Sequence, residues 1–114
     1  MIIRRFLLCA AASTAIALLA PFASAQTRLK VAIALPGSIT DNGWSQAGYD
    51  ALVAARSKWD IEFAYTEKIK EPDQVETLSD YARRGYNVVI AHGGEFQDAV
   101  DRVAPRFQIG RAHV

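Results

Sequence analysis

One segment constrains the fold more than any other part of the chain, because an apolar run leads directly into a polar loop and then an amphipathic helix. The segment runs from Leu29 to Leu52 and reads LKVAIALPGSITDNGWSQAGYDAL. Residues 30–35 form a nearly continuous apolar run, which is typical of a parallel strand that is covered on both faces. A Pro-Gly pair ends the strand, and apolar residues recur at near-helical spacing from about position 43. The sequence therefore predicts a strand, a loop and a helix.

Two further strand-helix units follow this segment. Residues 61–65 alternate apolar and polar side chains, which predicts a half-exposed strand at a sheet edge. Residues 72–85 predict a helix that begins at a proline and ends at a C-capping glycine. A third strand is expected over 86–91, and a third helix over 96–103, which Pro105 stops.

The alternation of strands and helices with short loops predicts an open, parallel, doubly wound α/β sheet with right-handed crossovers. In such a sheet the first strand is central, the second lies on one side of it and the third on the other. Ligands bind beyond the carboxyl ends of the strands, where the strand order reverses. We therefore expect the loops at residues 36–44 and 92–96 to face each other across a crevice.

The first of these loops carries residues that have both a structural and a functional interpretation. Trp44 lies on the first turn of the predicted helix, where its ring could stack on a planar ligand or pack into the core. Asp41 could accept hydrogen bonds from a ligand, and it is also, with Asn42, a natural N-cap for the helix. The two roles of Asp41 are compatible with each other.

The second loop offers backbone donors. Gly93 and Gly94 open the third predicted helix with exposed N–H groups, which favours a polar or anionic ligand group, although the neighbouring Glu95 disfavours an anion. The loop is not a G-x-G-x-x-G fingerprint and has no Walker lysine. His92 has no metal-ligand spacing with His113 or with a cysteine, so the sequence predicts neither a metal site nor a cofactor.

The N-terminal 25 residues have the pattern of an export signal. Arg4 and Arg5 provide a positive region, residues 6–20 an apolar region and residues 23–25 an Ala-Ser-Ala cleavage site, so the mature chain is expected to start at Gln26. This pattern predicts a periplasmic protein that is exported by general secretion. An uncleaved membrane anchor and a lipidated cysteine are the less favoured alternatives.

Charge and cysteine content narrow the expected partners. Two of the 13 Lys and Arg residues lie in the signal segment, and the others nearly balance the 12 Asp and Glu residues. Neither a nucleic acid nor an anionic membrane surface is therefore an expected partner. Cys9 is the only cysteine and also lies in the signal segment, so the mature chain must be stabilised by packing alone.

The chain resembles the basic membrane protein family of ABC-transporter substrate-binding proteins, the purine nucleoside receptor-like proteins. The resemblance covers about residues 29–107 and is carried by the strings D-N-G-W-S, Y-T-E and G-G-E-F. It implies a type I periplasmic-binding-protein-like lobe, one of two α/β lobes joined by a hinge. It also implies a protein that is not an enzyme, that binds a nucleoside or related small solute and that delivers this solute to a membrane permease.

The resemblance also implies which residues bind the ligand. They form two short clusters, one in each loop, and are Asp41, Asn42, Gly43, Trp44, Gly94, Glu95 and Phe96. The family often has Phe where this chain has Trp44, at a position that lines the base pocket, so a purine or another planar solute is expected. Sugar-binding type I receptors have the same topology and are the alternative. An exported α/β enzyme is the third possibility, which no motif supports.

A complete receptor of this kind has two lobes, so the chain is expected to be an N-terminal fragment that stops after three strand-helix units. Residues 26–107 are assigned to the partial lobe and residues 108–114 to a non-native tail. The tail ends in Ile-Gly-Arg-Ala-His-Val, which is the translation of a widely used sequencing-adapter read-through. At this place in the chain the fold would require another apolar strand. An authentic stop codon directly after Val114 would contradict this expectation.

Overall fold

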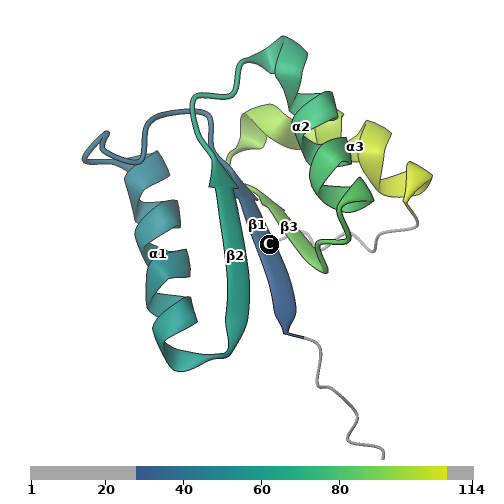
Figure 1. The fold of residues 1–114 in the computed structure, drawn as a ribbon. Helices are drawn as coiled ribbons and strands as arrows, with labels where there is room; N and C mark the ends of the chain where they lie inside the picture. The colour runs from purple at the N-terminus through teal and green to yellow at the C-terminus, as the bar shows by residue number, and fades with distance from the viewer. Residues whose placement is uncertain (1–27, 108–114) are drawn as a thin grey trace, which may run out of the picture.

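Strands and helices alternate through residues 28–107, the part of the chain that the computed structural model describes (Figure 1). The strands are β1 (Leu29–Ala34), β2 (Ile61–Thr66) and β3 (Val88–Ala91). The helices are α1 (Trp44–Lys58), α2 (Glu71–Arg83) and α3 (Gln97–Val103), and the 3-10 turns η1 (Gly94–Phe96) and η2 (Ala104–Arg106) flank α3. The predicted signal segment, residues 1–25, and the predicted tail, residues 108–114, lie outside the described residues.

The three strands form one parallel sheet in the order β2-β1-β3, which confirms the predicted central place of the first strand. Pairing is in a register that sets Val31 of β1 opposite Phe63 of β2 on one side and Val88 of β3 on the other. Residues 31–35 are consequently buried, whereas β2 has partly exposed residues along its length, as expected of an edge strand.

The helices cover the two faces of the sheet unequally, with α1 on one face and α2 and α3 together on the other (Figure 1). Alternate side chains of β1 supply a core on each face. Val31 and Ile33 pack with Leu52 of α1, while Ala34 packs with Leu78 of α2 and other residues of the opposite layer.

The third strand begins later than the sequence predicts, at Val88 rather than Tyr86. Asn87 takes part in the ladder in a different way, because its side-chain oxygen accepts a hydrogen bond from the Lys30 N–H at 2.9 Å. Its own N–H donates to the Lys30 carbonyl, also at 2.9 Å. The Asn87 side chain therefore accepts the hydrogen bond that a backbone carbonyl would accept in a regular strand.

The end of α3 also differs in part from the prediction. The helix does end at Val103, but Pro105 does not end the helical path, because it lies within η2, directly after α3. Proline is tolerated in the first turn of a helix, because the N–H groups of that turn have no acceptor within the helix and proline loses no hydrogen bond there. Of the helices within residues 28–107, none is both long and apolar enough to cross a membrane.

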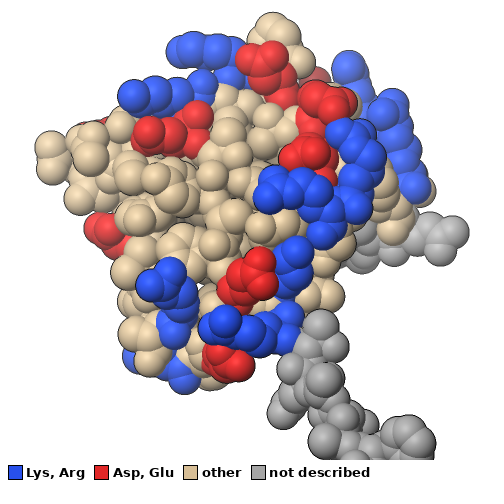
Figure 2. Space-filling model, in the orientation of Figure 1, with Lys and Arg blue, Asp and Glu red and all other residues tan. Residues whose placement is uncertain are grey.

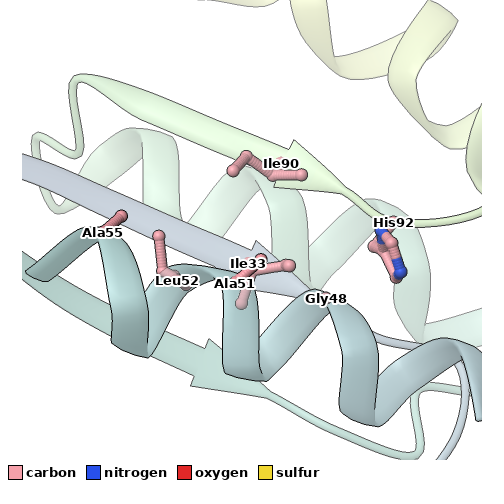
Figure 3. A pocket seen from close by; sticks show the side chains of 7 residues that line it. All are labelled: Ile33, Gly48, Ala51, Leu52, Ala55, Ile90 and His92. Carbon is pink, nitrogen blue, oxygen red and sulfur yellow. The ribbon is translucent and has the colours of Figure 1, made fainter.

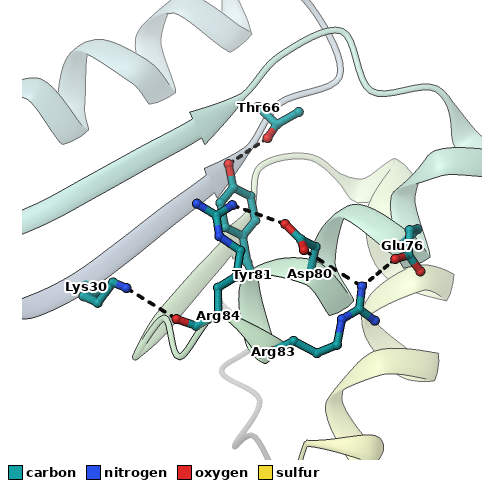
Figure 4. A network of polar contacts seen from close by, with 7 residues as sticks. All are labelled: Lys30, Thr66, Glu76, Asp80, Tyr81, Arg83 and Arg84. Carbon is teal, nitrogen blue, oxygen red and sulfur yellow. Dashed lines mark hydrogen bonds and ion pairs between the residues drawn. The ribbon is translucent and has the colours of Figure 1, made fainter.

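A polar network connects α2 to the sheet (Figure 4). The buried Tyr81 hydroxyl and the Thr66 hydroxyl share a hydrogen bond of 2.7 Å, and burial raises the pKa of Tyr81. Arg84 pairs with Asp80 at 3.2 Å on the outside of the same helix. Exposed ion pairs of this kind contribute little to stability, so the Tyr81–Thr66 bond is the more important attachment.

Candidate functional site

The loop after β1, residues 35–43, is bonded to the loop after β2 at three points, one of which is the bond from the Ile69 N–H to the Leu35 carbonyl at 3.2 Å. The N–H of Ile39 donates to the Glu67 carboxylate at 2.7 Å, and the N–H of Lys68 donates to the Gly37 carbonyl at 2.9 Å. These bonds hold the first loop at the carboxyl edge of the sheet. Glu67 belongs to the Y-T-E string, but the sequence alone predicts no role for it.

Asp41 caps α1. Its carboxylate accepts hydrogen bonds from the N–H groups of Gly43 at 2.8 Å, Ser45 at 3.0 Å and Gln46 at 3.1 Å. Such N–H groups at the start of a helix have no partner within the helix. The bonds stabilise the ionised form and hold the pKa of Asp41 below its ordinary value of 3.8, the bond from Gln46 having the largest effect. The capping interpretation is therefore confirmed, from a position two residues before the N-cap, Gly43.

The two residues after Asp41 are exposed. Asn42 has a φ of +54°, in the left-handed region that Asn tolerates better than most residues, and its N–H donates to the Gln46 side chain at 2.9 Å. Gly43 is not crowded, since a Cβ built on it would lie 3.7 Å from the nearest atom, which belongs to Asp41.

Gly37 and Ser45 fix the start of the loop against the helix. The Ser45 hydroxyl is buried, 1 % exposed, and accepts a hydrogen bond from the Gly37 N–H at 3.0 Å. A Cβ at position 37 would lie 2.8 Å from that hydroxyl, so the close approach requires glycine. The loop is therefore built around the first turn of α1.

Trp44 and His92 bring the two predicted loops together. Their rings stack with centroids 4.5 Å apart and an interplanar angle of 13°. The indole N–H donates to the His92 carbonyl at 3.3 Å, and His92 Nε2 lies 3.0 Å from the Trp44 carbonyl, which can only accept, so the imidazole proton lies on Nε2. Trp44 remains 63 % exposed, which excludes the interpretation that it packs into the core.

His92, one of the two stacked residues, also lines an apolar groove. The groove has a volume of about 300 Å³ and runs between α1 and the sheet (Figure 3). It is lined by Ile33, Gly48, Ala51, Leu52, Ala55, Ile90 and His92. The sequence predicts that the loops with Trp44 and His92 face each other, but it does not indicate this ring stack between residues that are 48 positions apart.

The second loop differs from its prediction at Gly93. Its N–H donates to the Ala91 carbonyl at 3.2 Å, so the predicted free donor is wrong at this position, and the 3-10 turn η1 rather than α3 follows it. Gly93 has a φ of +144°, a backbone conformation that residues with a side chain rarely adopt, so the loop favours glycine here. Gly94 and Glu95 are exposed.

Phe96 is the predicted site residue whose side chain the structure places away from the surface. It is fully buried and packs in the core beneath α2 and α3, with Ala34, Leu78 and Ala99 among its neighbours. The expected ligand contact of the Phe96 ring is therefore corrected to a core contact. The other six residues predicted to bind ligand lie at the surface, Asp41 to Trp44 at the start of α1 and Gly94 and Glu95 in η1.

The visible surface has charges of both signs, and the described residues include no candidate metal centre. On the face shown in Figure 2, Lys and Arg side chains are interspersed with Asp and Glu. Within residues 28–107, no group of three or more His, Cys, Asp or Glu side chains could hold a metal ion. Within this part of the chain, the chemistry available at the sheet edge is thus aromatic stacking together with hydrogen bonding.

Comparison with known proteins gives a family model, a curated relative and a solved structure that resemble the chain. The family model Bmp, described as ABC transporter substrate-binding protein PnrA-like, matches residues 28–109. Transcriptional activator protein med of Bacillus subtilis (strain 168) is 32 % identical over 75 residues, which are 65 % of this chain and 24 % of that protein.

Among solved structures, the chain is similar to the ABC transporter system solute-binding protein from Conexibacter woesei DSM 14684. It aligns with a TM-score of 0.66 and 21 % identity, over 70 % of this chain and 27 % of that chain, and supports the α/β fold. The chain therefore spans about a quarter of the length of both of these relatives.

Proposed function

Because the chain belongs to the Bmp family of PnrA-like ABC transporter substrate-binding proteins, we propose that it is part of the N-terminal lobe of an extracytoplasmic solute receptor. The receptor binds a planar small molecule, a purine nucleoside or a related solute, and passes it to the permease subunits of an ABC importer. It carries out no chemical turnover. Export by the predicted N-terminal signal places it in the periplasm.

The observation that carries this proposal is the exposed indole of Trp44 at the carboxyl edge of the sheet. Large aromatic side chains are usually buried, yet this one is 63 % exposed while being held by His92 through a ring stack and two hydrogen bonds. An ordered, exposed aromatic face is suited to stacking on a planar ligand.

Polar groups beside the indole supply the hydrogen bonds that the rest of such a ligand requires. Asn42 and Gly43 lie directly before Trp44, and Gly94 and Glu95 lie two and three positions after His92. Asp41 can bind a ligand only with the acceptor capacity that its three backbone bonds leave free. Orientation and specificity would come from these few polar groups.

Two alternatives use the same lobe differently. A sugar receptor would stack a pyranose face on Trp44, and the resemblance to a transcriptional activator suggests a ligand sensor. The predicted export signal favours transport over sensing. Titration with nucleosides and with ribose distinguishes a nucleoside receptor from a sugar receptor.

The test is calorimetric titration of the full-length protein that contains this segment with adenosine, guanosine, adenine and ribose. We expect a nucleoside to bind, and Trp44→Ala to weaken its affinity about fivefold or more, since an aromatic contact contributes on the order of 1 kcal/mol. Trp44→Phe should retain most of the affinity, because the flat face remains.

Trp59→Ala is the matched control, because Trp59 is equally exposed at 64 % but lies at the other end of α1. It should leave the affinity unchanged. If Trp44→Ala left the affinity within about twofold in a folded protein, the stacking role would be wrong. Tighter binding of ribose than of any nucleoside would favour the sugar receptor, and turnover of a probe would favour an enzyme.

A further inference from the structure

We propose that His92 is a positioning residue for Trp44, and that Gly48 is glycine so that the imidazole can take this place. The imidazole covers one face of the indole, so the opposite face is presented to a planar ligand in one orientation. This inference depends on the proposed function, in which Trp44 stacks on the ligand.

Three contacts between the same two residues hold the indole. The ring stack fixes its plane, the bond from its N–H to the His92 carbonyl fixes its rotation, and the bond from His92 Nε2–H to the Trp44 carbonyl holds the imidazole over the helix. Without them, an exposed tryptophan would be free to change rotamer. A side chain that is already ordered loses less entropy when a ligand binds, so the contacts should increase affinity.

Gly48 provides an independent observation, because it lies one helical turn after Trp44 and directly beneath the imidazole (Figure 3). A Cβ at position 48 would lie 2.7 Å from both Cδ2 and Nε2 of His92 and 3.1 Å from Cε1. Contacts this short would displace the ring. Glycine is otherwise unfavourable within a helix, so the packing of the imidazole accounts for its presence here.

Gly48→Ala is the decisive variant, since it should displace the imidazole while both rings remain in the chain. Alanine is a better helix former than glycine, so this variant should remain folded. His92→Ala removes the ring itself, and His92→Phe restores a flat ring without the Nε2–H donor. Ala54→Ser adds one heavy atom to an exposed position of the same helix, away from His92, and is the matched control.

The experiment uses the full-length protein with 15N-labelled tryptophan, in which Trp44→Phe identifies the Trp44 indole resonance. Without ligand, Gly48→Ala and His92→Ala should shift this resonance and leave that of Trp59 in place, while Ala54→Ser shifts neither. Adenosine affinity should fall about fivefold in the first two variants. In His92→Phe it should recover most of the way.

The outcomes distinguish a failure of the positioning role of His92 from a failure of the proposed function. An unchanged Trp44 resonance in Gly48→Ala would overturn the positioning role, and so would a shifted resonance with undiminished adenosine affinity. Failure of the unmodified protein to bind any nucleoside would instead overturn the proposed function, and that result is visible before any variant is made. Failure of His92→Phe to improve on His92→Ala would overturn the claim that the stacked ring face is what matters.

Discussion

The exposed carboxylate of Asp41 holds the start of α1 in place through three backbone hydrogen bonds. It accepts hydrogen bonds from the N–H of the N-cap, Gly43, and from the N–H groups of Ser45 and Gln46 in the first helical turn, and thereby orients the helix that carries Trp44. A change at Asp41 would therefore affect both the stability of the lobe and the geometry of the site. The two effects can be separated by measuring stability without ligand.

Replacing Asp41 should destabilise the protein in a pH-dependent way. Because its pKa is lowered by folding, the unfolded state binds a proton more readily, and the stabilisation is complete above the unfolded pKa, near 3.8. It is lost as the pH falls through the lower pKa of the folded state. We expect Asp41→Asn to have a lower Tm than the unmodified protein at pH 7, and the difference to shrink at pH 3.

Asp98→Asn serves as the control for that prediction, because it removes another exposed carboxylate near the start of a helix, here from the first turn of α3. A Tm difference for Asp41→Asn that is equal at pH 7 and pH 3 would contradict the role assigned to the ionised carboxylate. Circular dichroism melting curves are sufficient for the measurement.

The packing of η1 and α3 on the sheet limits which part of the second loop faces solvent. Phe96 ends η1, and its ring packs into the core with Ala34 of β1 and Leu78 of α2. The exposed part of the loop is thereby limited to its start, at Gly94 and Glu95. One buried side chain thus decides which part of the segment faces solvent.

Phe96→Ala should reduce the free energy of unfolding by about 3–5 kcal/mol, the usual cost of removing a buried aromatic ring. Phe96→Leu should cost much less and leave ligand affinity unchanged, because the side chain fills the core without touching the ligand. Urea unfolding and titration with adenosine measure the two quantities. A Phe96→Leu variant that kept its stability but lost affinity would show that the ring belongs to the binding site after all.

The lobe as described leaves one face of its sheet incompletely covered. Only α1 packs on that face, and the apolar groove beside it is lined by the buried Ile33 and the partly exposed Ile90. Among the described strands, β3 lies at an edge, and its first residue, Val88, is 41 % exposed. Both relatives are about four times as long as the matched segment, so they have further chain with which such surfaces could be covered.

Residues 28–107 produced in isolation should therefore self-associate, through the groove and the β3 edge. Sedimentation at several concentrations should show a rise in mean mass, and the thermal transition should be broad. Val88→Lys should reduce the association, because a charged side chain disfavours pairing at a strand edge. A monomeric fragment with a cooperative unfolding transition would contradict this prediction.

The strand order and the meeting of the two loops could be predicted from the sequence, because their signals are local. A continuous apolar run at residues 31–35, an alternating run at 61–65 and helical periodicity between them identify the units, and the general handedness of crossovers arranges them. The candidate positions Asp41 and Trp44 followed from the arrangement, since the carboxyl ends of parallel strands share one edge.

The tertiary structure decided which side chains at that edge face solvent and which are buried or held by contacts within the protein. The orientation of the Trp44 indole depends on contacts with His92, 48 positions away, and the imidazole can lie there because Gly48 has no side chain. Phe96 is buried because β1 and α2 meet it from distant parts of the chain. Such contacts join residues that have no regular spacing in sequence, so neither periodicity nor local composition can indicate them.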